Sequence, residues 1–138
     1  MDANAIATWI ATTAAGVSGM RGASSTDLDN IPATPYGIVG PPKGSIIGGS
    51  WERTHLSYPL RIYVGRMSGA GRDETTVRSL LNGLIAAFRT GGTQSGTVAS
   101  SLLTDFDAAL SDELGGEAYR VIDCTVEVVV NSGAGYTP

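Results

Sequence analysis

The chain has 138 residues, a hydrophobic content of 42% and a net charge of −4, which fit one folded domain over residues 1–138 with a single core. The acidic balance argues against a protein that grips nucleic acid through its phosphates, because such proteins carry basic patches. A single cysteine excludes an intrachain disulfide framework and a cysteine-rich metal site. The apolar runs are too short to cross a bilayer, and no basic segment typical of a secretory signal precedes them. We therefore expect a soluble protein, folded where it is made.

The first segment predicts an amphipathic helix that ends at glycines. Ile6, Trp9 and Ile10 lie at helical spacing, so we expect Trp9 to pack inward. The following residues, 18–30, are small and polar and predict a loop. Residues 34–40 (TPYGIVG) then predict a short strand that ends at two prolines.

The stretch from Lys43 to Arg66 predicts a hairpin or two linked strands. In its last part Leu60, Ile62 and Val64 fall at every second position, which places them on one face of a strand. This strand is the expected partner of the strand near the C-terminus.

Residues 73–89 give the clearest helix prediction. Six apolar side chains form one stripe at helical spacing: Val77, Leu80, Leu81, Leu84, Ile85 and Phe88. Asp73 and Glu74 suit its N-terminal end, Arg89 its C-terminal end, and Gly91 its C′ position. Gly83 weakens an exposed helix by about 1 kcal/mol relative to alanine, so we expect a close neighbour there.

A third, shorter helix is predicted around residues 100–110. Leu102, Leu103, Phe106 and Leu110 lie at helical spacing within SSLLTDFDAAL. The pair Gly115–Gly116 then predicts a turn into the last element.

The final stretch, Tyr119 to Val130, predicts a long strand with one buried and one wet face. Cys124 lies on the apolar face, between Ile122 and Val126, and is therefore expected to be a packing residue. We expect this strand to be central, to pair with residues 60–66 and to be covered by the helix at 73–89. The tail from Asn131 is expected to be mobile. Together these elements predict an α+β fold, a mostly antiparallel sheet with two or three helices packed on it.

The sequence offers no convincing catalytic, cofactor or metal site. His55 is the only histidine, and a general base needs a positioned partner. The aspartate pairs match no calcium-loop pattern. The turn at Gly69–Gly71 before a helix is reminiscent of a phosphate-binding turn, but Glu74 stands where the dinucleotide fingerprint needs a small residue. We expect no enzyme and no cofactor.

The remaining candidates are surface residues. Apolar side chains in a glycine-rich hairpin indicate a partner, although they could also fold back on the core; the basic ones could form ion pairs across a subunit boundary or face water. The candidate interface residues are Lys43, Ile46, Ile47, Trp51, Arg66, Arg72 and Tyr136.

The order of elements resembles that of tail terminator proteins of long, non-contractile-tailed bacteriophages. The resemblance covers nearly the whole chain and comprises an N-terminal helix, the blocks GIVGPP and ERTHLSYPLRIYVGR, a helix ending in AAFR, and the closing strand GGEAYRVIDCTVEVVV. No single motif in it is diagnostic.

The resemblance implies a virion protein at the head–tail junction, made in the host bacterial cytoplasm. Such proteins form a hexameric ring that caps the tail tube, ends its polymerisation and joins the head-completion or connector protein, while DNA passes through the ring. Net negative charge agrees with a lumen in which DNA slides without sticking. Two alternatives stay open: another junction protein, such as a stopper or tube subunit, and a small ligand-binding domain or enzyme using the Gly69–Gly71 turn.

Overall fold

The computed structural model describes residues 3–47, 53–89 and 98–131, which form an α+β fold with a mostly antiparallel six-stranded sheet. In chain order the elements are α1 (Ala3–Ala15), β1 (Gly22–Ser24), β2 (Tyr36–Val39), β3 (Lys43–Ile47), β4 (Arg53–Arg66), the 3-10 helix η1 (Ala70–Arg72), α2 (Glu74–Arg89), β5 (Val98–Leu114) and β6 (Glu117–Asn131).

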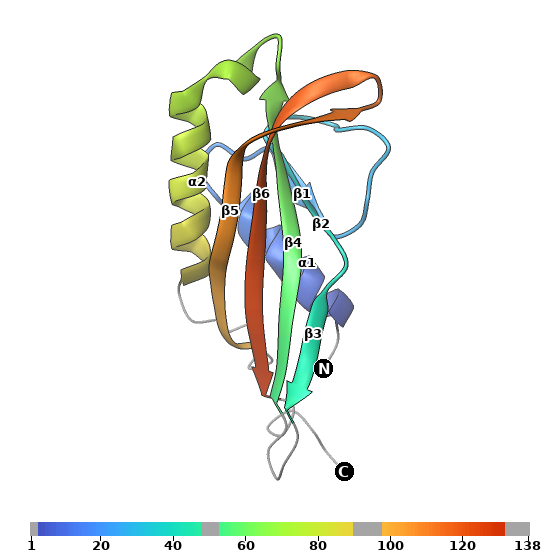
Figure 1. Ribbon diagram of the computed structural model, residues 1–138, viewed down its shortest axis with the longest axis vertical. Coiled ribbons are helices and arrows are strands. Elements are labelled where there is room, and N and C mark those ends of the chain that lie inside the picture. The colour runs from blue at the N-terminus through green and yellow to red at the C-terminus, as the bar shows by residue number, and fades with distance from the viewer. Residues whose placement is uncertain (1–2, 48–52, 90–97, 132–138) are drawn as a thin grey trace.

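The two long strands β4 and β6 form the centre of the sheet. They pair antiparallel from Arg53–Asn131 to Arg66–Tyr119, which confirms the predicted pairing and the central place of the last strand. β5 pairs with the other side of β6, while β3 and β2 pair with successive parts of β4, and β1 extends β2 in parallel. β5 and β3 therefore lie on opposite sides of the sheet (Figure 1).

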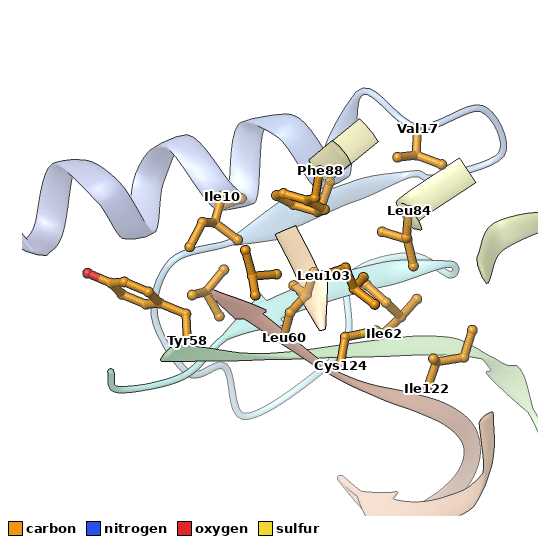
Figure 2. Packing of buried hydrophobic residues seen from close by; sticks show 14 of the residues in the cluster. Ile10, Val17, Tyr58, Leu60, Ile62, Leu84, Phe88, Leu103, Ile122 and Cys124 are labelled. Atoms are coloured by element: carbon orange, nitrogen blue, oxygen red, sulfur yellow. The ribbon is translucent and has the colours of Figure 1, made fainter. Parts of the chain in front are cut away.

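Both α-helices pack on one face of this sheet. Ile6 and Ile10 of α1 and Leu84 and Phe88 of α2 are fully buried against the alternating apolar residues of β4 and β6. Figure 2 shows Ile10, Leu84 and Phe88 in this packing. Trp9 is partly buried and packs edge-on against Phe88, with ring centroids 6.2 Å apart. The predicted stripe of α2 and the two-residue periodicity of β6 are confirmed, because each pattern runs unbroken along its element.

Gly83 has the close neighbour expected of it. A Cβ atom at Gly83 would lie 2.6 Å from Cγ1 of Val17, in the segment that follows α1. Glycine at this position lets α2 approach that segment closely, which offsets its low helix propensity.

The third predicted helix is wrong, because the region around 100–110 belongs to the edge strand β5. Register shifts between Leu103 and Asp105 and between Asp107 and Leu110 interrupt the alternation of this strand. Such bulges place apolar residues at a spacing that imitates a helix. The side of β6 that does not pair with β4 forms backbone hydrogen bonds with this region, and these bonds stabilise it as a strand. The predicted turn is confirmed, since Gly115 and Gly116 have φ of 61° and 81°.

Candidate interaction surface

A second, smaller apolar cluster lies on the open face of the sheet, opposite the helices. Tyr63 of β4 and Tyr119 of β6 meet edge-on with ring centroids 5.6 Å apart, and Ile38 and Val121 are buried with them. Five partly buried side chains pack on these four: Leu28 and Ile31 from the segment before β2, Tyr36 at the start of β2, and Leu110 and Leu114 of β5. The segment between β1 and β2 and the distal half of β5 thus fold over one end of the open face.

A groove of about 940 Å³ lies beside this cluster on the open face. Its lining includes five aspartates and one arginine: Asp27, Asp29, Asp105, Asp107, Asp123 and Arg61. Within the described ranges, no three histidine, cysteine, aspartate or glutamate side chains are grouped so as to hold a metal ion. Aspartates thus outnumber basic residues among the charged residues of the lining, and the groove carries net negative charge.

Arg61 links three strands across this groove. Its Nε and Nη2 donate to the two carboxylate oxygens of Asp123 at 2.6 and 2.8 Å, and its Nη1 donates to Asp112 at 2.9 Å. The Tyr63 hydroxyl donates to the same oxygen of Asp112 at 2.9 Å. Burial, and then the carboxylate of Asp112, raise the pKa of Tyr63. Asp112 comes from β5, so this network holds the distal half of β5 over the sheet.

The guanidinium of Arg61 is engaged by these two carboxylates. The hydrogen bonds to Asp123 are the largest cause of its raised pKa, and both carboxylates stabilise its charged form. A structural role follows, since an anionic ligand would have to displace two bound aspartates.

Large exposed apolar side chains lie on the two opposite edges of the sheet. Ile46 on β3 is 68% exposed, and Leu102 and Phe106 on β5 are 46% and 49% exposed. Within the described part of the chain, these three are the large hydrophobic residues that stand out in this way. Each of these two edge strands pairs with one neighbour in the sheet, and its other side has no partner strand among the described residues. Unpaired edges with apolar side chains are surfaces for another chain.

The predicted interface residues fall into three groups. Lys43 and Ile46 lie together on β3 and are exposed. Arg66, at the end of β4, and Arg72, in η1, are also exposed but lie elsewhere along the chain. Ile47 ends β3, and its side chain lies outside what the structure describes, as do residues Gly91, Trp51 and Tyr136. Asn131, the first residue of the predicted tail, ends β6, and the rest of the tail lies outside the described residues.

The sequence reasoning missed Leu102 and Phe106 because it placed them on the buried face of a helix. A usable signal was present in Asp105, Phe106 and Asp107, where charged residues flank an aromatic one at alternate positions. That alternation is typical of a strand.

The turn that resembles a phosphate site is occupied by the protein itself. The Asp73 carboxylate accepts hydrogen bonds from the backbone N–H groups of Thr75 and Thr76 and from the Thr76 hydroxyl, which lower the pKa of Asp73. Glu74 pairs with Arg120 at 2.7 Å. The hollow beside the turn, about 390 Å³, is lined by Gly69, Arg66 and Tyr119 among others. Two amides that an anion would use already bind a carboxylate.

The single cysteine and the single histidine lie on opposite faces of the sheet. Cys124 is buried in the main core, as predicted, and burial raises the pKa of its thiol to about 12, so it stays protonated. His55 is exposed on β4 and is paired in register with Val129 of β6.

No model of a known protein family matches this chain, and no curated protein matches it. Neither of the helices in the described residues is long and apolar enough to cross a membrane.

Proposed function

We propose that this chain is a structural virion protein of a bacteriophage, whose copies close into a ring that caps the tail tube and joins the tail to the head connector. The observation that carries the proposal is the placement of Ile46 on one edge of the sheet and of Leu102 and Phe106 on the other. Such a subunit has exposed apolar side chains on two different edges, which lie on opposite sides of the sheet.

Two different edges favour a ring over a symmetric dimer. A contact between the β5 edge of one copy and the β3 edge of the next is heterologous, so the joined pair still offers one free edge of each kind, the β3 edge of the first copy and the β5 edge of the second. Repetition closes into a ring when the rotation per subunit closes, and the hexameric ring of tail terminators is the expected outcome. Covering the edges also removes unpaired backbone groups from solvent.

The acidic open face supports passage of DNA rather than binding of DNA. Asp27 and Asp29 border the groove, and the guanidinium of Arg61 is already neutralised within it. Phosphate groups meet repulsion at such a surface, so DNA passing a lumen lined by it slides freely.

Another protein of the same junction is the main rival. A stopper is expected to be more purely β. Residues 100–110 form part of a strand where a helix was predicted, and this makes the chain more similar to a stopper. The helices α1 and α2 both pack on one face of the sheet, however, and favour the terminator. The rival that uses the Gly69–Gly71 turn is disfavoured by the carboxylate of Asp73 bound there.

Deletion of the gene followed by electron microscopy of the particles separates these functions. A terminator predicts tubes of irregular, excessive length that are not joined to heads. Tails of normal length joined to heads would contradict the proposal. A stopper predicts finished tails of normal length that stay detached, and a tube subunit predicts no tubes.

Edge variants then connect the phenotype to the surface. Complementation with Leu102→Glu/Phe106→Glu should fail, because two carboxylates cannot be buried in an apolar contact. The matched control is Ser79→Glu/Ala86→Glu, which adds the same two negative charges at exposed positions of α2 and should complement fully. Equal complementation by both variants would contradict a role for the β5 edge.

A further inference from the structure

The only lysine of the chain lies on one edge of the sheet and faces its open side. Lys43 is paired in register with Ser57 of β4. Leu56, Tyr58 and Leu60 are buried toward the helices, so the residues between them, Ser57 included, face the other way. Side chains directly opposite in a strand pair share a face. Lys43 is exposed and forms no ion pair with any described residue.

The opposite edge carries two carboxylates on the same open side. Asp105 and Asp107 of β5 are in register with Thr125 and Asp123 of β6, and both line the acidic groove. Both are exposed, and neither forms an ion pair among the residues that the structure describes. One chain therefore has a free cation on its β3 edge and free anions on its β5 edge.

Strand directions allow these edges to meet in a continuous sheet. β3 and β6 each run antiparallel to β4, and β5 runs antiparallel to β6. β5 therefore runs opposite to β3. If a second copy stands beside the first in the same orientation, its β3 runs antiparallel to the first copy's β5.

We propose that β3 of one copy pairs antiparallel with β5 of the next, with Lys43 of one chain against Asp105 and Asp107 of the other. The inference rests on the proposed ring and names the contact that closes it. The partner is a second copy of this chain, selected by charge on the open side of the joint.

On the helix side of the joint, Ile46 meets Ser101. Ile46 follows Lys43 by three positions, and the bulge between Leu103 and Asp105 places Ser101 on the helix side and Leu102, in register with Glu127, on the open side, so antiparallel pairing brings Ile46 beside Ser101. Ile46 is in register with Thr54, which is buried on the helix side. Ser101 is also buried there, and its hydroxyl donates to the carbonyl of Phe88 at the end of α2, 3.1 Å away. The joint thus covers Ile46 on one side and pairs charges on the other.

Zero-length carbodiimide cross-linking tests this contact. An equal mixture of ¹⁴N- and ¹⁵N-labelled protein, in solution and in purified tails, is cross-linked and its peptides are sequenced by mass spectrometry. We expect an isopeptide bond between Lys43 and Asp105 or Asp107 that joins a light to a heavy chain. Assignment is simple because Lys43 is the only lysine in the sequence.

Charge reversal provides the second readout. Lys43→Glu should weaken assembly about tenfold or more, and Lys43→Glu combined with Asp105→Lys/Asp107→Lys should restore it. The matched control is Arg78→Glu, which reverses an exposed cation on α2 and should leave assembly unchanged.

The outcomes separate the two proposals. A ring that forms without the Lys43 cross-link and is unaffected by Lys43→Glu overturns this pairing and leaves the ring in place. A chain that is monomeric in solution and absent from purified tails overturns both. Rescue by the triple variant supports the pairing in a way that a general loss of folding cannot imitate.

Discussion

The two faces of the sheet differ in how their side chains are satisfied. The face under α1 and α2 is a continuous apolar core built from every second residue of β4 and β6. The open face has a small aromatic cluster at one end, an arginine network beside it and an acidic groove. One face therefore supplies most of the burial that stabilises the subunit, while the open face and the edges remain available for contacts with other molecules.

Truncation of a core side chain should give the largest effect. Leu84 of α2 is fully buried, so Leu84→Ala should lower the free energy of unfolding by about 2–5 kcal/mol, through lost burial and the cavity left behind. Urea denaturation of dilute protein measures this value.

Leu102→Ala is the matched control, since it makes the same chemical change at a residue that is 46% exposed on β5. It should change the free energy of unfolding by no more than about 0.5 kcal/mol. Equal losses in the free energy of unfolding for Leu84→Ala and Leu102→Ala would mean that the β5 edge is part of the core. This result would contradict the difference between the buried face and the edge.

An added methyl group at Gly83 should give an intermediate effect. Alanine raises helix propensity by about 1 kcal/mol, but its Cβ would collide with Val17, and such overpacking costs about 1–3 kcal/mol. We expect Gly83→Ala to lower the free energy of unfolding by about 1 kcal/mol.

The same change in a Val17→Ala background should become neutral or stabilising, because the colliding methyl groups are gone. A double-mutant cycle in urea measures this coupling. If Gly83→Ala stabilises both backgrounds equally, close packing of α2 on this segment is not the reason for the glycine.

Loss of the Asp112 carboxylate on the open face should lower stability less than the changes at Leu84 and Gly83. Asp112→Ala removes one ion pair of Arg61, whose side chain and that of Asp112 are 39% and 35% exposed, so the free energy of unfolding should fall by less than about 1 kcal/mol. The loss should shrink further at high salt.

The titration of Tyr63 gives an independent readout of the same change. Burial raises the pKa of this phenol and remains in the variant, while the contribution of Asp112 disappears, so the pKa should fall part of the way toward its ordinary value. The raised pKa also means that Tyr63 stabilises the folded protein below its ordinary pKa and that this stabilisation is lost as pH rises through the folded value. Ultraviolet titration against Tyr63→Phe isolates the signal, and an unchanged pKa would place Asp112 away from the hydroxyl.

The sequence predicts the core better than the surface because the spacing of apolar residues along a helix or strand reflects which of its faces is buried. The stripe of α2 and the alternation around Cys124 each face one apolar layer without interruption, and both predictions are confirmed. β5 has no such layer along its whole length, and its bulges shift Leu102 and Phe106 out of a two-residue period. Its strand character depends on pairing with β6, which no local pattern contains.

The sequence predicts the acidic composition of the groove but not the groove itself. The sequence shows an excess of aspartates, but Arg61 meets Asp112 and Asp123 across 51 and 62 residues of chain. Which carboxylates are paired and which are free follows from strand register. The candidate residues Lys43 and Ile46 were predicted as interface residues from loop chemistry, and their common place on one sheet edge comes from the fold.

The mass of the assembled protein tests most directly whether the two edges join copies of this chain. Mass photometry and sedimentation over a concentration series, with and without tail tubes, should show a closed ring of six 14.2 kDa chains, and Leu102→Glu/Phe106→Glu should be monomeric. Wild-type protein that stays monomeric at every concentration, and also with tubes present, would contradict the account.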